Sequence, residues 1–219
     1  MIKVKFLFSL LFTVCISKGA FAQYSSEDWS SRDKWMKTES LLNLAEVTTG
    51  QVVADIGCHE GYLTTRLARK VDGNGRVYAV DVRDDRLATL RENANARNLT
   101  NIITILGDYD NPKLPEGALD CVFLIDTYHE ISAYKKVLNH IRKALKPGGH
   151  IMVLEKLKKR IIGKSRQEQV AAHSLAMHYV EKELQQAGFS IVSKIENHGL
   201  WEKEEDKQMW VLLAKKMIQ

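Results

Sequence analysis

The sequence predicts an α/β protein with a doubly wound seven-strand sheet, mostly parallel, with a C-terminal antiparallel strand and helices on both faces. Short apolar runs alternate with longer stretches that carry apolar residues at helical spacing, which is the pattern of repeated β-α-β units. Right-handed crossovers between such units produce a parallel sheet covered on both sides. The last two apolar runs are joined by a loop without a helix, so we expect an antiparallel hairpin there.

The first half of the chain follows this alternation. We expect, in order, a helix at 32–47, a strand at 52–56, a helix at 62–71, a strand ending at Asp81, a helix from Asp84 to about Arg97 and a strand at 102–106. Asp84 is expected to cap its helix, because an aspartate carboxylate can accept hydrogen bonds from the free amides of a first turn. Leu87, Leu90 and Ala94 share one face of that helix and predict its buried side.

The second half continues in the same way. We expect a strand at 119–125, a helix at 133–145, a strand at 150–155, a basic loop at 156–173, a helix at 174–187 and strands at 190–196 and 208–215. Gly188 follows the last helix, where its conformational freedom favours a C-terminal stop. We interpret residues 49–219 as one domain and residues 23–48 as an N-terminal segment and helix that cover its binding site.

A glycine-bearing turn directly after the first strand predicts a nucleotide-type ligand. The turn reads Asp55-x-Gly57-x-x-x-Gly61, and its glycines permit a sharp bend and a close approach of the ligand. His59 stands where a dinucleotide motif has its middle glycine, which argues against NAD and leaves an NAD-dependent oxidoreductase as the weaker alternative. Asp81 ends the next strand, where a carboxylate can accept both ribose hydroxyls. The pattern therefore favours a ligand with a ribose but no pyrophosphate.

These residues resemble the motifs of the class I S-adenosylmethionine (SAM)-dependent methyltransferases. The likeness covers nearly all of the chain after its N-terminus: 55–61 is similar to the first motif of the family, Asp81 to its ribose-binding acid, Gly107-Asp108 to its adenine-contacting element, 119–126 to its fourth strand and 145–151 to the turn into the fifth. The closing hairpin is also similar to that of the family. The resemblance implies SAM as the cofactor.

The resemblance implies a cofactor-binding set consisting of Asp55, Gly57, Cys58, Gly61, Asp81, Val82, Gly107, Asp108, Tyr109, Asp126 and Arg32. The carboxylate of Asp55 is expected to orient turn amides or the cofactor's ammonium group, and its alternative role is a cap of the turn. Asp108 is expected to accept a hydrogen bond from the adenine amine, while Tyr109 or Val82 packs on the ring; a plain loop turn is the alternative. Arg32, with Trp29 and Trp35, belongs to a segment that folds over the cofactor in similar methyltransferases.

The segment 126–130 is the candidate for the acceptor side, because it follows the fourth strand next to the expected methyl group. We expect Asp126, Tyr128 and His129 to act in catalysis, with His129 taking a proton from a hydroxyl or amine or, alternatively, only holding the loop. His173 is expected to be a helix cap or an acceptor contact, and His178 to pack.

The sequence indicates neither a metal site nor a disulfide. Asp126, His129, Glu130 and His173 are suitable ligand types, but no compact pair of histidines or cysteines is present, so we expect no metal. Cys58 and Cys121 are expected near opposite ends of neighbouring strands, too far apart to pair.

The N-terminus has the features of a cleavable secretory signal. Lys3 and Lys5 precede an apolar run at 6–16, and Ala20-Phe21-Ala22 is a small-x-small cleavage site. We therefore expect residues 1–22 to be removed, the protein to be periplasmic or secreted, and no transmembrane span to remain; an uncleaved membrane anchor is the alternative. Removal of this segment takes away three lysines and lowers the number of lysines and arginines from 32 to 29, against 27 acidic residues. So small an excess of positive charge gives no reason to expect a nucleic-acid partner.

The sequence thus predicts a methyltransferase that uses SAM to methylate an oxygen or nitrogen of a small-molecule acceptor. The alternative in another class is a non-catalytic SAM- or nucleoside-binding protein on the same fold, because SAM is made in the cytoplasm. Neither the acceptor nor the oligomeric state can be predicted from these motifs.

Overall fold

The computed structural model describes residues 28–217 of the chain. The expected signal peptide at 1–22, including its cleavage site, lies outside the described residues. Within residues 28–217, no helix combines the length and the apolar character needed to cross a bilayer.

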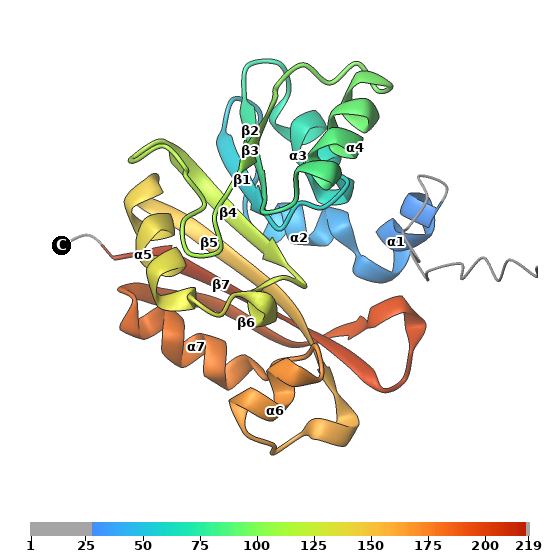
Figure 1. The fold of residues 1–219 in the computed structure, drawn as a ribbon, viewed down its shortest axis with the longest axis vertical. Coiled ribbons are helices and arrows are strands. Elements are labelled where there is room, and N and C mark those ends of the chain that lie inside the picture. The colour runs from blue at the N-terminus through green and yellow to red at the C-terminus, as the bar shows by residue number, and fades with distance from the viewer. Residues whose placement is uncertain (1–27, 218–219) are drawn as a thin grey trace, which may run out of the picture.

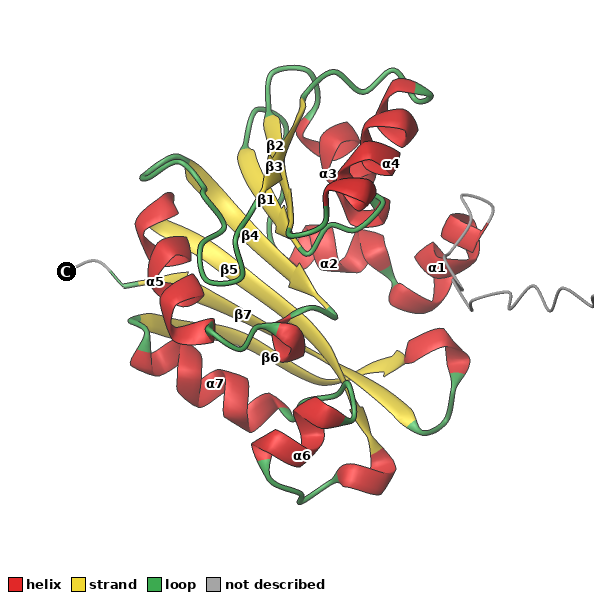
Figure 2. Ribbon diagram, viewed as in Figure 1, coloured by secondary structure: helices red, strands yellow, loops and turns green. Residues whose placement is uncertain are grey.

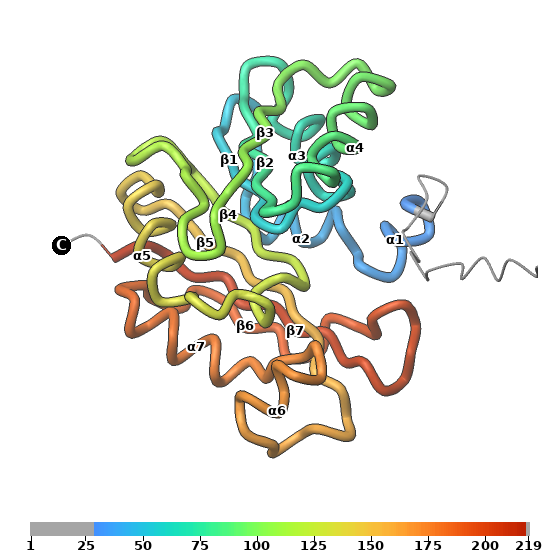
Figure 3. The backbone as a smooth tube through the Cα atoms, viewed as in Figure 1, coloured from blue at the N-terminus to red at the C-terminus, as the bar shows by residue number. Residues whose placement is uncertain are grey.

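A single twisted seven-strand sheet forms the centre of the molecule (Figures 1 and 3). Its order is β3-β2-β1-β4-β5-β7-β6. The strands are β1 Val52–Ile56, β2 Arg76–Asp81, β3 Ile102–Leu106, β4 Leu119–Ile125, β5 Leu145–Lys158, β6 Phe189–Leu200 and β7 Lys207–Lys216. The first five strands run parallel, whereas β7 is antiparallel to both of its neighbours, β5 and β6. The predicted sheet and its closing hairpin are therefore confirmed.

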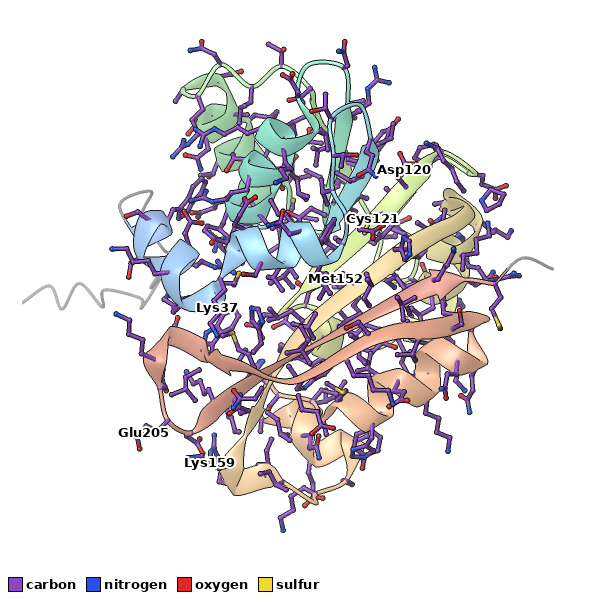
Figure 4. The ribbon with its side chains drawn as sticks, turned by 180° about the vertical axis from the view of Figure 1, so that it is seen from behind. Lys37, Asp120, Cys121, Met152, Lys159 and Glu205 are labelled. Carbon is purple, nitrogen blue, oxygen red and sulfur yellow. The ribbon has the colours of Figure 1, made fainter. Side chains whose placement is uncertain are left out.

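Helices cover both faces of the sheet (Figure 2). The helices are α1 Asp28–Met36, α2 Thr38–Leu44, α3 Tyr62–Val71, α4 Asp84–Asn95, α5 Tyr134–Ala144, α6 Arg166–Ala171 and α7 Met177–Gln186, with 3-10 turns η1 Tyr128–Glu130, η2 Lys159–Ile161 and η3 Trp201–Lys203. Successive strand residues point to opposite faces, so Val53 packs with side chains of α1, α2 and α3, while Ala54 packs with those of α5 and α7. Figure 4 labels Cys121 and Met152, which belong to the first of these clusters. Both described cysteines, Cys58 and Cys121, are free, as predicted.

The N-terminal helix differs from its prediction. The helix expected at 32–47 is broken at Lys37, which has a left-handed backbone (φ 51°) and separates α1 from α2. The break lies beside the β6–β7 hairpin (Figure 4). There His198 Nε2 lies 2.7 Å from the carbonyl oxygen of Met36, and the Trp35 and Trp201 rings pack at 4.8 Å between centroids. Contacts with this distant hairpin stabilise a bend that local helix propensity does not predict.

Other differences lie at helix ends and in the basic loop. Asp84 is the first residue of α4, not its cap; Arg83 holds that position, without a side-chain cap bond. The loop expected at 156–173 contains α6, which begins with a capping box between Ser165 and Glu168. The following helix starts only at Met177, because the hydroxyl of Ser174 instead donates to the Lys156 carbonyl oxygen at 2.8 Å.

Gly61 ends the turn after β1 and caps α3 with a left-handed backbone (φ 90°). A Cβ at this position would lie 2.8 Å from Leu90 Cγ. Gly61→Ala should therefore lower the free energy of unfolding by about 1–3 kcal/mol, through both backbone strain and the contact with α4. Urea denaturation of the two proteins measures this difference.

Gly73→Ala is the matched control. A Cβ added at Gly73 would meet no heavy atom within 4 Å, and the residue has no positive φ, so its substitution should be neutral or stabilise by about 0.4–1 kcal/mol. Equal effects of the two substitutions would contradict a special requirement for glycine at Gly61.

Candidate functional site

A cavity of about 500 Å³ opens at the carboxyl ends of the parallel strands. Its walls come from the turn after β1, the ends of β2 and β4, the loop after β3, α1, α5 and η3: Arg32, Ile56, Gly57, His59, Val80, Asp81, Val82, Arg83, Asp108, Tyr109, Pro112, Ile125, Asp126, Thr127, Glu130, Ile131, Val137 and Trp201. A smaller pocket shares Arg32, Gly57, His59 and Ile125 with this cavity and adds Asp55 and Cys58, among others. Position and volume are those of a ligand site in an open α/β sheet.

Nine of the eleven predicted cofactor residues line one of these two spaces. Seven line the main cavity, namely Arg32, Gly57, Asp81, Val82, Asp108, Tyr109 and Asp126, while Asp55 and Cys58 line the smaller pocket. Gly61 and Gly107 line neither, so their contact with the cofactor stays a prediction. Gly61 caps α3, and Gly107 lies so close to Val80 that an added Cβ would be 2.9 Å from its side chain. Both glycines act on the backbone around the site.

The carboxylate of Asp81 links the turn after β1 to the loop after β2 at the cavity mouth. One oxygen accepts a hydrogen bond from the His59 amide at 2.9 Å, and the other accepts from the Arg83 amide at 3.0 Å. A carboxylate has about four acceptor positions, so two remain for donors in the cavity. Asp81 is thus fixed in place with acceptor capacity left for a ligand.

Asp55 is buried at the end of β1. Thr64, in the first turn of α3, donates its hydroxyl hydrogen to the Asp55 carboxylate at 2.6 Å. Burial raises the pKa of Asp55 to about 6, although the Thr64 bond and the charge of Arg32 oppose the shift. The side chain therefore orients α3, as the alternative role of a turn cap requires, and it also lines the smaller pocket.

Arg32 reaches both spaces from α1 across a group of aromatic rings. Its guanidinium carbon lies 4.1 Å from the Tyr62 ring centroid and 5.5 Å from that of Trp201. Burial lowers the pKa of Arg32, while Asp126 and Asp55 favour its charged form. The aromatic rings thus hold the guanidinium cation of Arg32 near the carboxylates of Asp55 and Asp126.

Asp126 lies at the end of β4 with a left-handed backbone (φ 54°) and forms an ion pair with Lys156 of β5. Burial, followed by the charge of Glu155, raises the pKa of Asp126 to about 6. The Lys156 ammonium lies 4.7 Å from the Trp201 ring centroid. The predicted residue Asp126 therefore borders the cavity as part of a buried charge network.

His129 lies just behind the cavity wall. His129 is 3% exposed, and its Nδ1 lies 2.9 Å from Oε2 of Glu155. Glu155 is fully buried, and its carboxylate also accepts a hydrogen bond from the His129 amide at 3.0 Å. Burial opposes the charged ring, but the hydrogen bond and charge of Glu155 outweigh it and raise the pKa of His129. His129 Nε2 lies 3.7 Å from an oxygen of Glu130, which lines the cavity. His129 thus does not line the cavity itself but lies next to two residues that do: Glu130, and Asp126, whose Oδ1 is 3.9 Å from His129 Nδ1.

Tyr128 does not line the cavity, so its catalytic role stays a prediction. It is 1% exposed within the cluster under α5 and α7, and its hydroxyl donates to Glu183 at 2.8 Å. The short η1 turn directs successive side chains apart, so Tyr128 packs inward and Glu130 faces the cavity. His178 is exposed and its ring packs on Tyr179 at 4.1 Å between centroids.

Several site residues were not found from the sequence. Glu155 had a signal: an acid that follows the apolar run of a predicted strand must be paired if it is buried. Trp201 had none, because it reaches the cavity from the β6–β7 hairpin, far along the chain. Thr127 and Glu130 belong to the predicted acceptor-side segment 126–130, but only the turn geometry shows that they are the residues of it, with Asp126, that line the cavity.

The comparison with protein families agrees with this geometry. Residues 53–149 match a family described as a methyltransferase domain. Together with the sheet order, this match supports the predicted resemblance to the class I SAM-dependent methyltransferases over residues 53–149.

Individual proteins show how far the similarity extends. Aklanonic acid methyltransferase DauC of Streptomyces sp. is 31% identical over 107 residues, 46% of this chain and 49% of that protein. Ubiquinone/menaquinone biosynthesis C-methyltransferase UbiE of Enterobacter sp. is 29% identical over 115 residues, 52% of this chain and 46% of that protein. The chain thus spans about half the length of these relatives. A SAM-dependent methyltransferase from Aquifex aeolicus has the same fold, with a TM-score of 0.73 and 20% identity over 89% of this chain and 100% of that one.

The buried Asp55 predicts a pH-dependent stability. The pKa of Asp55 is about 6 in the folded protein and 3.8 ordinarily, so folding takes up a proton between these pH values. The resulting stabilisation of the folded state is complete below about pH 3.8 and is lost as the pH rises through 6. Asp55→Asn removes this dependence and can keep the Thr64 bond. The variant should therefore gain about 2 kcal/mol in unfolding free energy relative to the wild type between pH 4 and pH 7.5. Urea denaturation across this range tests it, and a constant difference between the two proteins would contradict the assignment.

Proposed function

We propose that the protein is a SAM-dependent methyltransferase that transfers a methyl group to an oxygen or nitrogen of a small-molecule acceptor. The observation that carries the proposal is one cavity bordered on one side by Asp81 and the Gly57 turn, and on the other by Asp126 and Glu130. The cavity has room for a nucleoside-sized cofactor and an acceptor side by side.

The residues at the β2 and β3 end fit the nucleoside half of SAM. Asp81 has acceptor capacity left for two ribose hydroxyls. Val82 and Tyr109 are 40% and 78% exposed at this end and offer apolar surfaces to the adenine ring. Asp108, next to Tyr109, would accept from the adenine amine and is also paired with Lys113 at 2.9 Å.

The turn after β1 and the smaller pocket fit the methionine half. A Cβ on Gly57 would lie 2.3 Å from the Thr127 side chain, so only glycine lets the turn pass this close to the end of β4. Asp55 would attract the ammonium group and Arg32 the carboxylate, because each lines the pocket with the opposite charge.

When bound, SAM supplies an electrophilic methyl group on its sulfonium. The protein's main contribution to such a displacement is to hold the acceptor in line and close. Ile131, Val137 and Trp201 give the acceptor side an apolar wall. Glu130, with His129 behind it, is the group at that wall that can accept a proton. The names of the two relatives, which act on aklanonic acid and in quinone biosynthesis, support a small-molecule acceptor.

Isothermal titration of SAM into the purified protein tests the cofactor assignment. Asp81→Ala should weaken binding by about 1.5–3 kcal/mol for each charge-assisted hydrogen bond lost. Asp84→Ala, which removes an exposed acid three residues further on, should bind as the wild type does. Unchanged affinity in the Asp81 variant, with circular dichroism showing a folded protein, would contradict the ribose assignment.

Methyl transfer is measured in a separate experiment from SAM binding. Methyl-labelled SAM incubated with extracts should yield a labelled small molecule, whose analysis identifies an oxygen or nitrogen acceptor. A carbon acceptor would contradict that part of the proposal. SAM binding without any labelled product would favour a non-catalytic binding protein.

We also propose that residues 1–22 direct export and are removed. This is supported by Lys3 and Lys5 before the apolar run at 6–16, and by the small residues Ala20 and Ala22. The intact mass of the protein recovered from the periplasm or medium should correspond to a chain that begins at Gln23. An uncleaved chain retained in the cytoplasm would contradict export.

A further inference from the structure

His129, Glu130 and His173 come together at the rim of the cavity, although His173 lies far from the other two in the sequence. His129 Nε2 and His173 Nδ1 each lie 3.7 Å from the same oxygen of Glu130. The two imidazole rings stand nearly perpendicular, with centroids 5.8 Å apart. One ligand atom from each residue lies within 4.8 Å of the others. We call these three residues the rim cluster.

The rim cluster is held from behind by a buried carboxylate. Glu155 binds His129 Nδ1 at 2.9 Å and the His129 amide at 3.0 Å, so ring position and tautomer are set and Nε2 is the nitrogen directed toward Glu130. Metal-binding histidines ordinarily have their second nitrogen bound to such a carboxylate, which orients the ring and makes it a stronger ligand. This contact is a second, independent indication of a ligand site.

The spacing of the rim cluster suits a small ion. Ligands about 2.0–2.2 Å from a tetrahedral zinc ion lie about 3.4 Å from one another. The 3.7 Å separations are already close to this value, and the exposed side chains of Glu130 and His173 can close the remainder. The other possible set, Asp126, His129 and Glu155, is less suitable, because Asp126 is paired with Lys156 and Glu155 already holds His129.

We propose that the rim cluster binds a divalent transition-metal ion of the Zn²⁺ type through two imidazole nitrogens and one carboxylate. Two nitrogens and one carboxylate oxygen favour such an ion over Mg²⁺, which prefers oxygen ligands. Three protein ligands leave a fourth position open, and Glu130 places it at the cavity. If the proposed function holds, an acceptor hydroxyl bound there would release its proton to water, because Glu130 and His129 would hold the ion instead of acting as the base, and would present its oxygen to the methyl group. The sequence predicted no metal, because only the fold brings His173 to His129.

Zn²⁺ alone, titrated calorimetrically into the metal-free full-length protein, tests the site. The wild type should bind one ion per chain, and His173→Ala and Glu130→Gln should each weaken binding at least about tenfold. Both positions are exposed, so these variants should fold. His178→Ala is the matched control, because it removes an exposed histidine five residues from His173 and outside the rim cluster.

Two results would overturn the site: no binding by the wild type, or binding that neither the His173 nor the Glu130 variant weakens. Weakening by His178→Ala equal to that by His173→Ala would also overturn it. The titration contains no SAM, so its failure is distinguishable from failure of the proposed methyl transfer.

Discussion

The site depends on the position of β1, which pairs in parallel with β2 on one side and β4 on the other. The chain crosses over in opposite directions from this strand, so the connections at the carboxyl ends of β1 and β4 diverge and leave a crevice. The cavity lies in this crevice, and its charged residues Asp81 and Asp126 stand at strand ends on either side of β1. Parallel pairing brings these ends to one edge.

The second constraint is the burial of charge on β5. Glu155 and Lys156 are almost fully buried at the end of this strand, and each is paired with the segment after β4: Glu155 with His129, and Lys156 with Asp126. Buried charges without such partners would be costly, so the pairs hold the η1 turn in one arrangement. That arrangement sends Tyr128 into the core and Glu130 to the cavity.

The strands up to β4 could be predicted to the residue because each is a short apolar run between polar turns, and parallel pairing only requires such runs. The break at Lys37 and the late start of α7 could not, because both depend on contacts with distant segments. Most residues of the expected cofactor set line the cavity for a similar reason: they follow strand ends directly. Tyr128 and His129 follow a strand end too, but inside a tight turn, where one residue changes the direction of a side chain.

The sequence by itself determined the sheet, the turn after β1 and the acids Asp55 and Asp81, because periodicity and turn chemistry act within a few residues of the chain. Only the tertiary structure decided which groups meet at the acceptor side. Glu155, His173 and Trp201 reach it from β5, the segment before α7 and the last hairpin. No local pattern encodes such a meeting, because it follows from the packing of segments that are distant in the chain.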